Sequence, residues 1–180
     1  MITPNTRLAF IGGIHGVGKS HFSSQLAGIL GILHVSAGDL ITRQRQTSSQ
    51  ADKRVTDVSG NQDVLITAIR ASALIDKTFI LDGHFCVLDS MGKICEIPMA
   101  TFATLAPACA IVLTDDISTI RERLRRRDNK DHPAKIMESL QQAEVAHAKQ
   151  VCNALEIPLE IYRSQDAEAA KQFILRGIKN

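Results

Sequence analysis

The stretch Gly12 to Phe22, GGIHGVGKSHF, contains residue types that together can bind phosphate. Its segment Gly13-Ile14-His15-Gly16-Val17-Gly18-Lys19-Ser20 satisfies the pattern GxxxxGK[ST]. Glycines adopt backbone angles that other residues avoid, so consecutive N–H groups can converge on a phosphate at the start of a helix. Lys19 adds a positive charge near the β and γ phosphates, and Ser20 offers a hydroxyl to Mg²⁺. The segment therefore predicts a loop that binds the phosphates of ATP.

A carboxylate follows an apolar run further along the chain. Phe79-Ile80-Leu81-Asp82 has three apolar residues before Asp82, which is typical of a buried strand that ends beside a bound nucleotide. We expect Asp82 to hold Mg²⁺ through water, and His84 follows two residues later. Strands that end in Asp are common, so this interpretation depends on the phosphate-binding loop.

The segment IRERLRRRDN carries five arginines. Arg123 and Arg127 are four residues apart, which places both on one face of a helix. Two cations on one face suit a polyanion, and an arginine of this kind can contribute ~10³ to 10⁵ in the rate of phosphoryl transfer. The alternative is a solvated basic helix whose cations lie favourably at its C-terminal end.

A candidate acceptor site follows the second predicted strand, in Ser36-Ala37-Gly38-Asp39-Leu40. Asp39 and the nearby Arg43 and Arg45 are expected to face the cleft at the carboxyl edge of the sheet. If the acceptor is a phosphate, the arginines are needed to neutralise it. If the acceptor is a hydroxyl, Asp39 is the candidate to take its proton.

The hydrophobic pattern predicts an α/β fold, because short apolar runs alternate with segments of helical periodicity. Parallel strands need crossover connections, so we expect a doubly wound, five-stranded parallel sheet of the P-loop type. The predicted strands cover 8–11, 33–35, 78–81, 108–113 and 158–161. The predicted helices cover 20–30, 62–75 with Asn61 as its N-cap, a segment that follows TDD and ends near 126, 134–155 and 166–178. The apolar stripe of the helix over 134–155 is expected to contain Ile136, Leu140, Ala143, Val151 and Leu155.

The chain of 180 residues, 44% hydrophobic, is the size of one domain. We expect a single domain over 1–180, with a mobile acceptor-side segment around 40–60 and a short lid around 127–135. The net charge of +2 does not indicate a nucleic-acid or membrane partner. No apolar run reaches the roughly 20 residues that span a bilayer, and the first residues do not resemble a signal peptide, so we expect a cytoplasmic protein.

The remaining cysteines and histidines are interpreted as packing or surface residues. Cys86, Cys95, Cys109 and Cys152 form no CxxC pair, which favours packed free thiols over a zinc site. His147 falls on the apolar stripe of its helix and is expected to be a hydrogen-bonded packing residue. His15 occupies a variable position of the phosphate loop, where we expect a solvent-facing side chain rather than a catalytic one.

Together, the segments GIHGVGKS, SAGDL, ILDGH and ERLRRR resemble the nucleoside monophosphate kinases, and most of all the archaeal-type and related nuclear adenylate kinases. The resemblance runs from about Leu8 to Arg163, and the order of the motifs carries more information than any one of them. It implies ATP and Mg²⁺ as cofactors and a nucleoside monophosphate as the small-molecule acceptor. Archaeal-type members can form trimers, so the resemblance also leaves room for a homo-oligomer.

The resemblance also implies roles for individual residues. It assigns the donor phosphates to Gly13, Gly16, Gly18, Lys19 and Ser20. Arg123 would contact adenine and Arg127 phosphate, and the loop that contains Ser164 and Gln165 would lie near the adenine.

On the acceptor side, Asp82 and His84 match a metal-binding and catalytic pair, while Gly38 and Asp39 match a GD motif. The chain departs from the family at Thr42, where an acceptor-binding arginine is usual and Arg43 is displaced by one residue. The predicted monophosphate site therefore lacks the arginine that usually binds the acceptor at this position.

Three functions follow from these residues. The first is an ATP- and Mg²⁺-dependent kinase that phosphorylates a nucleoside monophosphate. The second is a small-metabolite kinase that acts on a hydroxyl, which the departure at Thr42 favours. The third is a slow ATPase that serves as a switch or assembly factor, in which the segment 44–60 moves when a nucleotide or partner binds.

Overall fold

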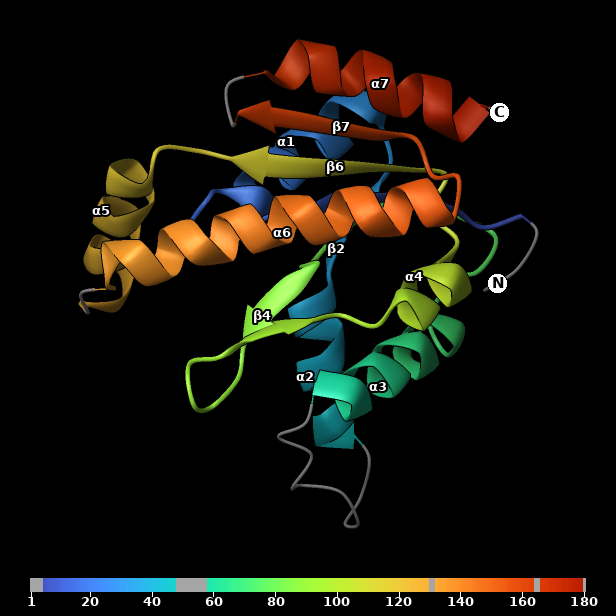
Figure 1. Ribbon diagram of the computed structural model, residues 1–180. Helices are drawn as coiled ribbons and strands as arrows, with labels where there is room; N and C mark the ends of the chain where they lie inside the picture. The colour runs from blue at the N-terminus through green and yellow to red at the C-terminus, as the bar shows by residue number, and fades with distance from the viewer. Residues whose placement is uncertain (1–4, 48–57, 130–131, 164–165, 180) are drawn as a thin grey trace.

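The computed structural model describes residues 5–47, 58–129, 132–163 and 166–179 (Figure 1). Helices and strands alternate along most of the chain. Their bounds are β1 Arg7–Gly12, α1 Lys19–Leu30, β2 Leu33–Ser36, α2 Ala37–Thr47, α3 Val58–Arg70, β3 Thr78–Asp82, β4 Cys86–Leu88, β5 Ile94–Glu96, α4 Met99–Leu105, β6 Cys109–Thr114, α5 Ile117–Asp128, α6 Ala134–Ala154, β7 Leu159–Arg163 and α7 Ala167–Lys179.

The main sheet has five strands in the order β2-β3-β1-β6-β7, and every neighbouring pair is parallel. The predicted doubly wound α/β fold is therefore confirmed. Because β1 lies at the centre, its carboxyl end at Gly12 is flanked by the ends of β3 and β6. The loops that leave this edge of the sheet can therefore meet in one place.

Side chains of β1 alternate between two hydrophobic clusters, as expected for a strand buried on both faces. Ala9 and Ile11 pack in a cluster to which α1 and α7 contribute, and Leu8 and Phe10 pack in another with α3 and α4. In Figure 1, α6 crosses in front of the strands, while α2, α3 and α4 lie together below the sheet. The sheet thus provides a rigid base for the loops at its carboxyl edge.

Several local predictions differ from the structure. Helix α3 begins at Val58, so Asn61 lies inside the helix and the prediction of an N-cap was wrong. The side-chain oxygen of Asn61 instead accepts a hydrogen bond from Arg45 of α2. Residues 40–47 and 58–60 of the expected mobile segment are helical, and residues 48–57 lie outside the described part of the chain. The predicted lid begins within α5, and residues 130–131 are not described.

The region between β3 and β6 contains elements that the sequence did not predict. Strands β4 and β5 pair antiparallel in a small separate sheet, and helix α4 follows. Each strand has three residues and α4 has seven, so none is long enough to give a clear periodicity. Val87 of β4 and Thr101, Phe102 and Leu105 of α4 line the cavity that is described below.

The buried face of α6 also differs from the predicted stripe. Ile136 is 41% exposed, whereas the buried residues are Met137, Leu140, Glu144, His147, Ala148, Val151 and Cys152. His147 is a hydrogen-bonded packing residue, as predicted, because its Nε2 lies 2.8 Å from the carbonyl oxygen of Ile97. A buried glutamate on this face was not predicted.

The cysteines are free thiols, and those at 86, 109 and 152 are buried. Burial raises the pKa of Cys86 and Cys109 to about 12, so both stay protonated. Within the described ranges, no group of three or more His, Cys, Asp or Glu side chains is arranged to hold a metal ion. The same ranges contain no helix with the length and apolar character needed to cross a membrane.

Candidate phosphate-binding and phosphotransfer site

The predicted phosphate loop lies between β1 and α1. Gly13, Gly16 and Gly18 have φ angles of 140°, 81° and 104°, in the range that side chains disfavour. Ile14 and Val17 are fully buried and anchor the loop in the hydrophobic core. The apolar residues therefore hold the loop against the core, and the glycines allow the backbone turns that bring its N–H groups near the start of α1.

Lys19 lies in the cavity at this loop and is only 8% exposed. Its Nζ donates to the carbonyl oxygens of Gly13 at 2.7 Å and Ile14 at 3.1 Å. Burial lowers the pKa of Lys19 to about 8, although the nearby carboxylates of Glu144 and Asp82 act to raise it. The ammonium group is therefore charged at neutral pH and held beside the loop.

Glu144 of α6 connects the phosphate loop to the loop that follows β3. It is fully buried, and its Oε1 accepts hydrogen bonds from the backbone N–H groups of Gly13 at 2.7 Å and Phe85 at 2.9 Å. Its Oε2 accepts a third bond from the N–H of Cys86. Burial raises the pKa of the Glu144 carboxyl, while these N–H groups and Lys19 favour its ionised form. One carboxylate thus fixes the spacing of two loops of the site.

Gly12 is needed for the same close approach of the phosphate loop to the loop that follows β3. A Cβ at this position would lie 2.7 Å from Cδ2 of Phe85 and 3.2 Å from Oε1 of Glu144. A side chain at Gly12 would therefore push the loop after β3 away. Sequence reasoning did not single out Gly12, since GxxxxGK[ST] begins at Gly13.

Asp82 lies at the end of β3, as predicted, and is 3% exposed. Its Oδ2 lies 2.8 Å from Nε2 of His34 on the neighbouring strand β2, an interaction that the sequence did not reveal. Asp82 and Ser20 both line the same cavity. A carboxylate and a hydroxyl are oxygen ligands of the kind that Mg²⁺ takes, so this pair fits a magnesium ion.

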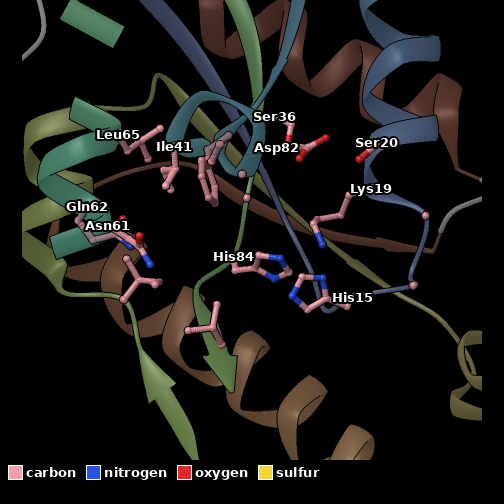
Figure 2. A pocket seen from close by; sticks show the side chains of 18 of the residues that line it. His15, Lys19, Ser20, Ser36, Ile41, Asn61, Gln62, Leu65, Asp82 and His84 are labelled. Carbon is pink, nitrogen blue, oxygen red and sulfur yellow. The ribbon is translucent and has the colours of Figure 1, made fainter. Parts of the chain in front are cut away.

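His15 and His84 lie together between the phosphate loop and the rest of the cavity, with ring centroids 4.3 Å apart (Figure 2). His15 is exposed, as predicted, although its ring also contacts His84. Partial desolvation and the charges of Lys19 and Arg127 lower the pKa of His15 to about 4. Burial, Lys19 and His15 hold the pKa of His84 well below its ordinary value. Both imidazoles are therefore neutral at pH 7.

Helix α5 brings Arg123 and Arg127 to the cavity, as their spacing predicted. Nη1 of Arg123 donates to the carbonyl oxygen of Val17 at 3.1 Å and lies 2.9 Å from Oδ2 of Asp115. Arg127 forms two hydrogen bonds with the carboxylate of Asp128. Lys19, Arg123 and Arg127 thus place three cations along the cavity beside the phosphate loop.

The cavity at the site has a volume of about 530 Å³. Figure 2 shows Lys19 and Ser20 on one side, Asn61, Gln62 and Leu65 on the opposite side, and His84 between them. Gly38 lines the cavity, whereas Asp39 and Arg43 are exposed and do not. Ser164 and Gln165 lie outside the described residues.

Gly16 makes a close contact with helix α5. A Cβ at Gly16 would lie 2.6 Å from Cγ of Leu124, which is buried against the loop. We expect Gly16→Ala to destabilise the protein by about 1–3 kcal/mol, because it adds this clash to an unfavourable φ. Chemical denaturation measures the change, and ATP affinity should fall with it.

Gly28→Ala is the matched control for this substitution. Gly28 lies in the interior of α1, and a Cβ there would meet nothing within 4 Å. We expect that variant to gain stability of about 1 kcal/mol from helix propensity. Equal stability of the two variants would contradict the proposed role of the Gly16 contact.

The fold and the site define a P-loop NTPase with a kinase-like fold: a parallel sheet with a glycine-rich loop, a lysine and a helix after its central strand. The sequence profile of the AAA_17 family, described as an AAA domain, matches residues 12–141. The chain belongs to this family. No curated protein sequence matches the chain.

Solved structures support the same fold. An uncharacterized protein from Eubacterium ventriosum ATCC 27560 superposes with a TM-score of 0.52 at 14% identity, over 97% of this chain and 98% of that one. A gluconokinase from Sinorhizobium meliloti 1021 gives a TM-score of 0.51 at 15% identity, over 98% of this chain and 94% of its own. At these identities the likeness concerns the fold alone.

Proposed function

We propose that this protein transfers the γ-phosphoryl group of ATP to a hydroxyl group of a small acceptor. The observation that supports this most directly is the cavity, which joins the phosphate loop to a pocket of apolar and uncharged polar side chains. A kinase needs such a cavity because donor and acceptor must meet in a fixed geometry away from water. The fold that the chain shares with a protein named a gluconokinase is consistent with a small acceptor.

The residues at the loop would act by positioning and charge. Backbone amides of 13–20 and the ammonium of Lys19 would hold the donor phosphates, and Arg123 and Arg127 would stabilise charge on the transferred group. Ser20 and Asp82 would hold Mg²⁺, which neutralises phosphate charge when bound. His34 fixes the orientation of the Asp82 carboxylate through their hydrogen bond.

The acceptor hydroxyl requires a proton acceptor, and His84 is the best placed. Its ring lies between the two sides of the cavity and has a hydrogen bond with the Gly13 backbone. The lowered pKa makes the neutral imidazole a weak base, but the hydroxyl proton becomes far more acidic as its oxygen bonds to phosphorus, and the other ring nitrogen can take the proton at that point. The acceptor oxygen forms a bond to the γ-phosphorus, the bond from that phosphorus to the β–γ bridging oxygen breaks, and ADP leaves.

A nucleoside monophosphate is the second candidate acceptor, as an adenylate kinase-like reaction would require. It is favoured by Arg127, which lines the cavity and could neutralise an acceptor phosphate. Asp39, the earlier candidate for a base, is exposed and outside the cavity lining, so it supports neither reaction directly.

The test is transfer of label from [γ-³²P]ATP, with Mg²⁺, to pools of small alcohols and of nucleoside monophosphates. We expect labelled organic phosphate with the alcohol pool, at a rate at least tenfold above release of inorganic phosphate. Label transfer only to monophosphates would support the second candidate. Release of inorganic phosphate alone, unaffected by either pool, would support a slow ATPase and contradict a kinase.

A further inference from the structure

The side of the cavity opposite the phosphate loop, here named the acceptor half, is built by β2 and helices α2, α3 and α4 with the β4–β5 hairpin. Its apolar wall includes Phe10, Ile41, Leu65, Phe102 and Leu105. The ring centroids of Phe10 and Phe102 lie 5.4 Å apart, and Phe102 stacks on Phe85 at 4.6 Å. Packed aromatic rings give this wall a fixed shape.

The acceptor half differs in charge from the phosphate loop. Among the lining side chains that the structure describes, the cations Lys19, Arg123 and Arg127 are near the loop, and no cation lines the acceptor half. The carboxylate of Asp82, which pairs in register with Ser36, is the negative group at the boundary between the two halves. Its polar side chains are Ser36, Asn61, Gln62 and Thr101. A phosphate or carboxylate enclosed there would lose its hydration without gaining an opposite charge, which is strongly unfavourable.

Asn61 gives the acceptor half a defined hydrogen-bonding direction. Its Oδ1 accepts a hydrogen bond from Nη2 of Arg45, which itself is not among the residues that line the cavity. With the oxygen engaged, the Asn61 amide nitrogen remains to donate to a ligand. Figure 2 places Asn61 on the far side of His84 from Lys19.

We propose that the acceptor is an uncharged, ring-bearing alcohol, of which a nucleoside is the type. Its ring packs on the apolar wall, its polar edge accepts a hydrogen bond from Asn61, and its hydroxyl reaches past His84 to the γ-phosphate. An asparagine N–H can donate to an acceptor on the edge of a nucleobase, such as N7 of adenine, without using the amide oxygen. The inference rests on the proposed phosphotransfer, and it excludes acceptors that already carry a phosphate or carboxylate.

The test compares matched acceptors with the full-length protein, ATP and Mg²⁺. Nucleosides and uncharged aromatic alcohols are each paired with a charged counterpart, their 5′-monophosphates or carboxylic acids, and gluconate is added. ADP release and product mass are measured. We expect at least one uncharged member to give a kcat/KM at least tenfold above its charged counterpart. A charged member that performs better, or no uncharged member that is phosphorylated, overturns the proposal.

The two proposals fail in distinguishable ways. If a monophosphate or gluconate is phosphorylated well, the kinase function stands and the uncharged acceptor is wrong. If no compound is phosphorylated and only inorganic phosphate appears, the kinase function itself is wrong.

Asn61→Asp tests the residue that gives the pocket its specificity. Aspartate keeps an oxygen for Arg45 but removes the N–H donors and adds a negative charge. We expect the KM of the uncharged acceptor to rise at least tenfold, while the KM of ATP changes less than twofold. Asn153→Asp, at an exposed position of α6, is the control and should change neither. Equal effects on both KM values, or none on the acceptor, would contradict the assigned role.

Discussion

Lys19→Ala is expected to lower kcat/KM for ATP by about 10²–10³, the effect of removing one preorganised group aimed at transition-state charge. The ammonium of Lys19 is buried beside the loop and held by two backbone carbonyl oxygens, so it needs little rearrangement to meet a phosphate. Calorimetry with ATP and Mg²⁺, together with steady-state kinetics, measures the loss. Lys149→Ala, at an exposed position of α6, is the control and should leave both unchanged.

The same residue predicts a pH dependence. Because burial lowers the pKa of Lys19 to about 8, the charged form is lost as pH rises through 8. ATP affinity of the wild type should therefore decline between pH 7 and 9.5. Lys19→Ala has no ammonium to lose and should show a flat profile over this range. Matching profiles for the two proteins, or unchanged ATP affinity in Lys19→Ala, would refute the phosphate-binding role.

Glu144→Ala is expected to destabilise the protein by several kcal/mol. It leaves the N–H groups of Gly13, Phe85 and Cys86 without their acceptor, and each buried unsatisfied group costs about 1–3 kcal/mol. That loss is a large part of the about 5–15 kcal/mol that stabilises a typical domain. Denaturant unfolding measures the change in the free energy of unfolding.

Glu144→Gln keeps the side-chain volume and one acceptor oxygen. It therefore tests the hydrogen bonds of Glu144 without creating a cavity. The NH₂ group of the glutamine would face one of the backbone N–H groups that Glu144 accepts from, which leaves that donor without an acceptor. We expect the free energy of unfolding to fall by about 1–3 kcal/mol. The KM of ATP should also rise, since the Gly13 N–H and His84 depend on this junction. Glu138→Gln, exposed on the same helix, should change stability by less than about 0.5 kcal/mol. A Glu144→Gln protein with wild-type stability and ATP affinity would disprove the role.

The sequence predicted the parts of the site that depend on local spacing. GxxxxGK[ST] located Lys19 and Ser20, and the apolar run before Asp82 located the end of β3. The four-residue spacing of Arg123 and Arg127 placed both at the cavity. Each of these signals lies within one helix, one strand end or one turn. In such a short segment the residue spacing determines where the side chains lie relative to one another.

Residues whose partners are distant in sequence were missed. Glu144 is 131 residues from Gly13, and a glutamate in a helix ordinarily indicates a solvated face. Its only signal was helical spacing with Met137, Leu140, Ala148 and Val151, which a charged residue obscured. His34 pairs with Asp82 because β2 and β3 are neighbours, and strand order cannot be read from local periodicity. The acceptor half likewise depends on α4, which is too short to predict.

Leu124 occupies the space that a side chain at Gly16 would fill, and the same turn region of α5 carries Arg123 and Arg127. A small shift of the loop backbone at Gly16 would press on Leu124 and, through it, on the helix that carries the two arginines. We expect donor binding and the placement of both guanidinium groups to be coupled through this packing contact, in addition to the hydrogen bond from Arg123 to the carbonyl oxygen of Val17.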